Sequence, residues 1–404
     1  MKLIHGKGIY DSERQRMNGN GLLIYGSDIA ACGSFDELYE QHPGANIIDW
    51  RDGYVMPGLI NTHVHLEFTP GSDSYGTYVT ESSDLHIQKA RMHAKEMLLS
   101  GVTSARDLGS SMELVTRRET VSGKNFPKLF LAGAPLTQTK GHLFYLGGAA
   151  DTEEELREAV ATHFDAGCDC IKMMINGGQN TPGSLPERRA YDKKTIRATV
   201  DEAHRFGMTV AVHCLTTESF VNAMEGDADS IEHCACFERS ASSGLLERVY
   251  QTQVMDSFRG NCRFFMAGFS NHYHLLDDAR SGKKSATQEE LFMLQQEERE
   301  AEIICNLIDL GMCPVIGTDA GFGLTYFNET WMELALLVER CGLSEADAIK
   351  AATENGASAL QENKVGSLQS GYRADMIALS RNPLHDIRAF SDVQHVMSRG
   401  LVVS

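Results

Sequence analysis

The chain contains the run Val55-Met56-Pro57-Gly58-Leu59-Ile60-Asn61-Thr62-His63-Val64-His65, an apolar segment that ends in two histidines one residue apart. Because the side chains of a strand alternate between its two faces, His63 and His65 point the same way from the end of one strand. Two imidazoles placed in this way are suitable ligands for a metal ion. A single His-x-His pair also fits a plainer interpretation, two histidines in a turn. The rest of the sequence has to distinguish a metal site from such a turn.

The length and composition of the chain fit a globular protein with a buried site. Its 404 residues are 42% hydrophobic, which is enough for one large domain and a smaller one. The formal net charge of −18 argues against nucleic-acid and anionic-membrane partners, since both require clustered Lys and Arg. No segment has the length and apolarity of a signal peptide or a membrane span. We therefore expect a soluble, cytoplasmic protein.

The ten cysteines are scattered through apolar surroundings, which favours free thiols in a reducing compartment. Two Cys-x-Cys pairs are present, Cys168/Cys170 and Cys234/Cys236. Neither has the Cys-x-x-Cys spacing of a structural zinc site, so we do not expect structural zinc there.

Short β-branched or apolar runs alternate with helix-period segments along the middle of the chain. The runs predicted to be buried strands are residues 55–65, 101–107, 128–133, 169–174, 208–213, 229–233 and 313–319. A further strand is expected between residues 249 and 268, where segments 249–255 and 263–267 compete. Segments 152–166 and 193–206 are predicted to be helices between the strands. This alternation predicts a parallel α/β sheet, and its length and strand number favour a (β/α)8 TIM barrel over an open sheet.

Both ends of the chain have a different pattern. Short alternating runs occupy residues 2–10 and 21–31, and again residues 366–368, 374–379, 393–397 and 401–403. Each end is too short to fold alone, so we expect the two ends to build one small β-sandwich with the barrel inserted between them. The predicted division is residues 1–54 and 361–404 for the sandwich and residues 55–360 for the barrel.

Further candidate metal ligands lie at the ends of other predicted strands. Lys172 lies on the inward face of its strand, where a buried ammonium is costly. Carbamylation by carbon dioxide would convert it to an anionic oxygen ligand. His213, His233 and Asp319 end the later strands, and each alone fits a core histidine or a helix N-cap. Together with the first two histidines, at the carboxyl ends of barrel strands, they form a specific pattern.

The chain resembles the amidohydrolase superfamily of metal-dependent hydrolases over nearly its whole length. The matching segments are 57–65, Ile171-Lys172, His213, Ser230-Ile231-Glu232-His233, Gly317-Thr318-Asp319 and 365–376. The resemblance is greatest to the binuclear branch with a carboxylated lysine, which includes imidazolonepropionase-related proteins, Xaa-Pro dipeptidases and zinc carboxypeptidases. Thr139-Lys140-Gly141-His142 resembles the glycine-histidine loop of that branch, and Asn176-Gly177-Gly178 resembles its glycine pair.

The resemblance implies two divalent metal ions held by the side chains of His63, His65, Lys172, His213, His233 and Asp319. Carbon dioxide would be the source of a Lys172 carbamate that bridges both ions. Nitrogen and oxygen ligands favour zinc, although manganese or iron could serve. A hydroxide shared by the ions would attack the substrate carbonyl. Asp319 would be the general base, and His142 would lie beside that carbonyl.

The sequence also offers candidate substrate-binding residues on the active face of the barrel: His142, Arg188, Arg189, His272, Tyr273 and His274. The two arginines can bind a carboxylate with two parallel hydrogen bonds, although a loop arginine is more often a surface charge. The segment 272–274 follows the last uncertain strand and fits either substrate gating or a solvated loop. These groups favour a small polar substrate with a free carboxylate.

The predicted function is hydrolysis of an amide-type C–N bond in a dipeptide, N-acyl amino acid or cyclic amide. The alternative substrates are xenobiotic amides, carbamates, ureas and lactones. Two other classes stay open: a deaminase with one metal ion and a noncatalytic assembly protein. Retention of every ligand type argues against the assembly protein, and the lysine argues against the deaminase. We expect a homo-oligomer that acts on a small molecule.

Overall fold

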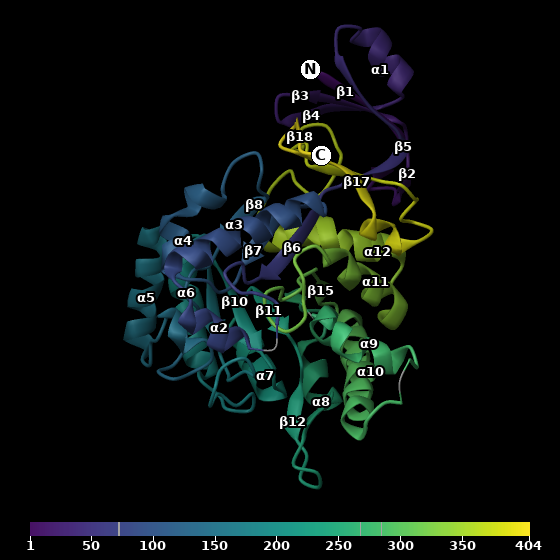
Figure 1. Cartoon of the computed structure of the whole chain (residues 1–404). Coiled ribbons are helices and arrows are strands. Elements are labelled where there is room, and N and C mark those ends of the chain that lie inside the picture. The colour runs from purple at the N-terminus through teal and green to yellow at the C-terminus, as the bar shows by residue number, and fades with distance from the viewer. Residues whose placement is uncertain (72, 267, 284) are drawn as a thin grey trace.

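The computed structural model describes residues 1–404 apart from positions 72, 267 and 284, and apart from the side chain of His272. Figure 1 shows two regions: a sheet in which both chain ends lie side by side, and a larger body of strands and helices. Among the described helices, none has both the length and the apolarity to cross a membrane.

Both ends of the chain pair in one sheet of order β18-β17-β16-β5-β1-β3-β4, with β2 paired to β1. Its strands are β1 (Lys2–Asp11), β2 (Arg16–Met17), β3 (Gly21–Tyr25), β4 (Asp28–Gly33), β5 (Asn46–Pro57), β16 (Met376–Leu379), β17 (Val393–Ser398) and β18 (Leu401–Val402). Strand β5 joins the ends, because it runs parallel to β1 and antiparallel to β16. Helix α1 (Phe35–Gln41) packs Leu38 against Leu3 and Leu23. The pairing gives one sheet and does not show the two layers of a sandwich, so the sandwich and the domain boundaries stay predictions.

Within the described part of the chain, the larger body contains eight parallel strands in two sheets. One sheet has the order β6-β7-β8 and the other β15-β14-β11-β10-β9. The strands are β6 (Leu59–Val64), β7 (Val102–Asp107), β8 (Lys128–Leu131), β9 (Cys170–Met174), β10 (Thr209–Cys214), β11 (Ser230–His233), β14 (Phe264–Met266) and β15 (Cys313–Pro314). Isolated parallel bridges, Leu136 to Met173 and Val64 to Ala320, connect the sheets at both of their edges. The α/β class is confirmed. Only isolated bridges link the two sheets among the described residues, so the strand pairing does not by itself show a closed barrel.

The observed strands follow the predicted segments closely. Each of the segments predicted as buried strands overlaps one of the parallel strands. For the uncertain strand, the structure selects the 263–267 segment, in which β14 pairs with β11 and β15; position 267 lies outside the described residues. The competing segment 249–255 instead contributes the short helix α8 (Thr252–Met255).

Helices cover the parallel strands on the outside (Figure 1). The predicted helices appear as α5 (Glu153–Ala166) and α6 (Lys193–Arg205), and Thr152 closes the start of α5 with a capping box. The other α-helices are α2 (Ser74–Thr80), α3 (Ser83–Leu99), α4 (Met112–Thr116), α7 (Thr217–Glu225), α9 (Asp277–Arg280), α10 (Gln288–Asp309), α11 (Thr330–Cys341), α12 (Glu345–Lys350) and α13 (Gly356–Ala359). Apolar residues of these helices and the outward faces of the strands form one large core.

A hairpin of β12 (Phe237–Arg239) and β13 (Leu246–Arg248) projects beside α10, at the end of the molecule opposite the terminal sheet (Figure 1). The short turns are η1 (Arg118–Val121), η2 (Phe144–Leu146), η3 (Asp256–Phe258), η4 (Phe269–His272), η5 (His274–Leu276), η6 (Ala351–Asn355) and η7 (Ile387–Ser391). The turns η4 and η5 follow β14 along the chain.

Candidate metal centre

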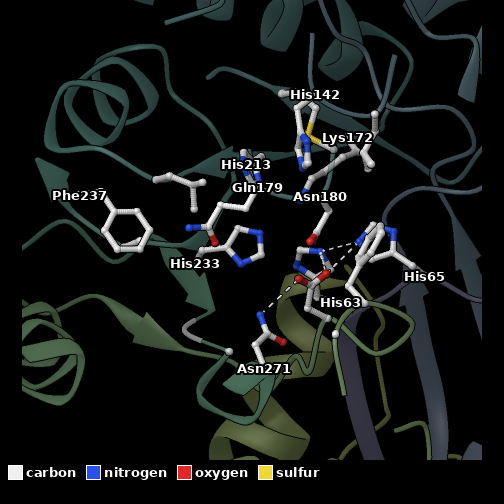
Figure 2. Close-up of a pocket in the computed structure, with 18 of the residues that line it drawn as sticks. His63, His65, His142, Lys172, Gln179, Asn180, His213, His233, Phe237 and Asn271 are labelled. Atoms are coloured by element: carbon white, nitrogen blue, oxygen red, sulfur yellow. Dashed lines mark hydrogen bonds and ion pairs between the residues drawn. The ribbon is translucent and has the colours of Figure 1, made fainter. Parts of the chain in front are cut away.

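One pocket at the carboxyl ends of the parallel strands brings together the predicted metal ligands. Its lining includes His63, His65, Lys172, His213, His233 and Asp319, together with His142 (Figure 2). Because parallel strands all end at the same edge, residues from strands far apart in the sequence meet there. His233 is half-buried and the other ligand candidates are buried.

The backbone at two of these positions is unusual. His233 and Asp319 have φ values of 72° and 58°, in the left-handed region that non-glycine residues rarely adopt. Such conformations persist only when the surrounding structure enforces them, and they concentrate at functional sites. In this chain both side chains line the pocket, His233 at the end of β11 and Asp319 in the segment that follows β15.

His63, His65 and Asp319 form a tight cluster. The Nε2 atoms of the two imidazoles lie 3.2 Å apart, and Asp319 Oδ1 lies 3.4 Å from His63 Nε2 and 3.0 Å from His65 Nε2. One nitrogen or oxygen atom from each residue can therefore contact a single cation. In the described part of the chain, these three residues have ligand atoms that all lie within 4.8 Å of one another, as a metal site requires.

Buried groups behind the two histidines fix their orientation. The Nδ1 atom of His63 lies 2.7 Å from Glu232 Oε2, and the Nδ1 atom of His65 lies 2.9 Å from the carbonyl oxygen of Gly109. Both partners are acceptors, so each Nδ1 carries the proton and each Nε2 lone pair faces the pocket. Arg106 Nη2 holds the other oxygen of Glu232 at 3.1 Å. A second layer of this kind is typical of metal-binding histidines.

Regular strand alternation would point Glu232 opposite to His233 and out of the barrel, and the structure shows a different arrangement. Glu232 is fully buried and points inward, because it is the parallel partner of inward-facing His213 in the β10–β11 register. His233 would then face outward in a regular strand. Its left-handed backbone returns its side chain to the pocket.

The remaining candidates form a second group beside the first. The rings of His213 and His233 are centred 4.8 Å apart, and the ring of His63 is 5.1 Å from that of His233. Lys172 lines the same pocket, and its Nζ atom is buried without a hydrogen-bond partner among the described residues. A buried polar atom without a partner is costly, so this position fits a lysine whose amine carries a further group.

The electrostatic state of the pocket suits metal ligation. Burial, followed by the neighbouring Lys172 or histidine charges, holds the pKa of His63, His213 and His233 well below the ordinary histidine value. Burial also lowers the pKa of Lys172 to about 8. Neutral imidazoles and an amine that loses its proton readily are the forms that bind metal ions and carbon dioxide.

His142 lies above the second group, with its ring centre 4.8 Å from that of His213. Its Nδ1 atom lies 2.9 Å from Thr181 Oγ1, which also accepts the backbone N–H of Leu143. If Thr181 donates its hydroxyl proton to Nδ1, the Nε2 atom of His142 carries a proton that it can donate. A Cβ atom on Gly178 would lie 2.5 Å from His142 Nε2, which explains the glycine at this position.

Most of the predicted substrate-binding residues do not reach the pocket. Arg188 and Arg189 are exposed and lie outside its described lining, and Arg189 pairs with Glu218 at 2.8 Å. Tyr273 packs under Arg280, and His274 lies 2.7 Å from Glu329. The side chain of His272 lies outside the described part of the structure.

Other residues, which sequence reasoning missed, contribute to the pocket instead. Asn271 Nδ2 donates to Asp319 Oδ2 at 3.3 Å (Figure 2). Arg248 also lines the pocket, and its Nη2 atom lies 2.7 Å from Glu300 Oε1. Gln179 and Asn180 complete the polar wall. These residues lie on loops and on the β12–β13 hairpin, where strand periodicity gives no signal.

Eight parallel strands with histidines and a carboxylate at their carboxyl ends define an α/β protein with a candidate metal centre. The chain belongs to the amidohydrolase family, whose model matches residues 54–403. It is 27% identical to an ochratoxinase of Aspergillus niger over 437 aligned positions, which cover 98% of this chain and 85% of the relative. It is 26% identical to an imidazolonepropionase of Rubrobacter xylanophilus over 89% of this chain and 84% of that protein.

Among solved structures, the chain is similar to a Xaa-Pro dipeptidase with methionine bound in its active site. The TM-score is 0.84 and the identity 25%, with 99% of each chain covered. These neighbours share the amidohydrolase fold. Family membership and the named relatives support a hydrolase that acts on C–N bonds of small molecules.

Proposed function

We propose that the protein is a binuclear metal-dependent hydrolase that cleaves an amide-type C–N bond in a small substrate. The observation that carries the proposal is the convergence on one pocket of the four histidines of the predicted ligand set, a carboxylate and a buried lysine that has no hydrogen-bond partner among the described residues. We also propose that residues 55–360 close into a (β/α)8 barrel, since bridges connect both edges of its two sheets, and that both chain ends form a separate small domain.

The donor set fits two divalent ions, with zinc as the best match to nitrogen and oxygen ligands. His63, His65 and Asp319 would hold one ion, and His213 and His233 the other. A carbamate on Lys172, formed from carbon dioxide, would bridge them and supply a partner for the buried Nζ atom. When bound, the ions supply Lewis acidity and lower the pKa of water.

Two groups of the chain are placed to move or donate protons. Asp319 would accept the proton of the attacking water and return it to the leaving amine, while Asn271 holds Oδ2 of that carboxylate. His142 would donate its Nε2 proton to the developing oxyanion of the substrate carbonyl. Burial of both groups excludes bulk water from these transfers.

Dipeptides and N-acyl amino acids are the first substrate class, which the likeness to a Xaa-Pro dipeptidase supports. Neutral xenobiotic amides, carbamates, ureas or lactones are the second. One observation favours the second class: the predicted carboxylate-binding arginines lie away from the pocket, and Arg248, which lines it, is paired with Glu300. A substrate carboxylate would therefore have to compete with Glu300 for the Arg248 guanidinium.

Metal analysis of the purified protein and a substrate screen test the proposal together. We expect two metal equivalents per chain and hydrolysis of N-acyl amino acids or dipeptides. One equivalent with release of ammonia would indicate a deaminase, and an inactive metal-free protein would indicate an assembly role. Amidation of the substrate carboxylate should lower kcat/KM by about tenfold, the effect of one charge-assisted contact. Faster hydrolysis of neutral substrates would select the second class.

A further inference from the structure

An apolar groove opens directly from the metal pocket. It lies between the β12–β13 hairpin and α10, and its lining shares Gln179, Phe237, Arg248 and Glu300 with the pocket. The rest of its apolar lining comes from Leu245, Leu246, Leu276, Phe292 and Met293. Because four residues line both spaces, a molecule in the pocket can extend into the groove.

The two spaces differ in size and chemistry. The pocket offers about 110 Å³ and is walled largely by imidazoles, amides and charged groups, whereas the groove offers about 580 Å³. Figure 2 shows Phe237 on the side of His233 that faces away from His65, and Phe237 lines both spaces. A bulky apolar group therefore fits the groove and does not fit beside the metal ligands.

The walls of the groove are fixed to each other. Gln296 Oε1 of α10 accepts the backbone N–H of Arg248 at 2.7 Å, and Arg299 of α10 pairs with Glu247 of the hairpin at 3.1 Å. The Arg248 guanidinium lies 4.8 Å from the ring centre of Phe237. A preformed groove of this kind costs little reorganisation when a ligand enters.

Apolar side chains in the groove remain open to solvent. Leu245 is 49% exposed, and Leu246, Phe292 and Met293 are half-buried. Clustered exposed apolar groups beside a polar pocket mark a binding surface, because covering them removes apolar area from water. The shared lining makes the substrate of the pocket the best-placed occupant.

We propose that this groove, between the hairpin and α10, binds an aryl or medium-chain alkyl arm of the substrate whose C–N bond is cleaved in the pocket. The assignment rests on the proposed function. A groove with this role makes the enzyme selective for amides that carry one bulky apolar group. Arg248 and Glu300, which line both the pocket and the groove, would contact the part of the substrate between that group and the amide.

The test compares N-octanoyl and N-acetyl derivatives of one amino acid. The octanoyl compound should have the higher kcat/KM, by about tenfold or more, since several buried methylenes each contribute. Met293→Asn and Leu246→Asn should lower the octanoyl-to-acetyl ratio by about fivefold or more. Leu291→Asn is the matched control, because Leu291 lies on the same helix, is 56% exposed and lies outside the described groove lining.

Calorimetric titration with octanoate and with acetate separates this inference from the proposed function. Octanoate should bind more tightly than acetate, and Met293→Asn should remove the difference. If no amide is cleaved but octanoate binds in this way, the proposed function fails and the groove assignment stands. Equal kcat/KM values for the octanoyl and acetyl compounds, together with equal affinities for octanoate and acetate, would overturn the groove assignment alone. Groove variants that only change the oligomeric state on gel filtration would show an interface between copies and also overturn it.

Discussion

Glu232 Oε2 lies 2.7 Å from His63 Nδ1, and this carboxylate is fully buried behind the imidazole that it orients. Arg106 holds the second carboxylate oxygen at 3.1 Å and also donates to the carbonyl oxygen of Thr62 at 2.8 Å. The arrangement fixes both the ring plane and the tautomer of His63. It acts on the proposed metal site only through that histidine.

Replacing Glu232 with Gln should weaken metal binding. The amide can present its NH2 group to Nδ1 and so favour the tautomer that protonates Nε2, which removes the lone pair from the pocket. Metal affinity should fall by about 10–100-fold, the usual effect of losing such a partner. Competition with a chromophoric chelator measures it. Glu225→Gln, at a surface pair with Lys193, is the control, and equal affinities for the two variants would contradict the orienting role.

Replacing Lys172 with Ala should prevent loading of two ions. The variant loses the proposed bridging carboxylate, so metal analysis should find at most one equivalent per chain. Short carboxylic acids such as acetate should restore part of the activity, because they can occupy the space left by the side chain. Full activity with two ions in the alanine variant would show that Lys172 carries no bridge.

Replacing Asp319 with Asn should separate catalysis from metal binding. The amide keeps one oxygen for the ion but cannot accept a proton at neutral pH. Turnover should therefore fall by about 10²–10⁴-fold, while most of the metal is retained. Measurement of kcat and of the metal content on the same sample of the variant tests this prediction. Near-normal turnover in a fully loaded variant would assign the proton transfer to another group.

Stability should depend on pH through Glu333, which accepts the backbone N–H groups of Ser270 at 2.7 Å and Phe269 at 3.2 Å. Burial raises its pKa from 4.5 to about 7. Between these values the folded state keeps the proton that the unfolded state releases, so the free energy of unfolding falls as pH rises. At about 1.4 kcal/mol per pKa unit, the loss is at most a few kcal/mol.

Thermal denaturation of wild type and Glu333→Gln between pH 5 and pH 8 measures this effect. The variant loses an acceptor for one backbone N–H, so it should be less stable at pH 5. Its disadvantage should shrink toward pH 8, because it has no carboxyl group to ionise. Parallel stability curves would show that Glu333 does not change its protonation over this range.

The sequence contained enough information for the parallel strands and the convergence of the ligand candidates. Both depend on local patterns, since apolar runs of strand length are buried and their last residues share one edge. The choice of β14 over segment 249–255 does not follow from a local pattern, because both segments have similar strand propensity. Tertiary pairing decides between them. Strand alternation alone would also place Glu232 outside the barrel, because it assumes an extended backbone, which His233 does not have.

Which loop residues line the pocket could not be predicted from the sequence. Arg188 and Arg189 lie in a loop, and nothing periodic in a loop fixes which side chains turn inward. Arg248 reaches the pocket only because the hairpin folds beside α10 and Gln296 holds its backbone. Such contacts join segments that are distant in sequence and are specified by packing.

The strand β5 also affects how the chain is synthesised. Its edge toward β16 stays unpaired until residues 376–379 emerge, although its other edge can pair with β1 at once. At ~5–20 residues per second, the roughly 300 intervening residues take on the order of 15–60 seconds to translate. For that interval this edge of β5 has no partner strand, and an unpaired strand edge is a template for pairing with another chain.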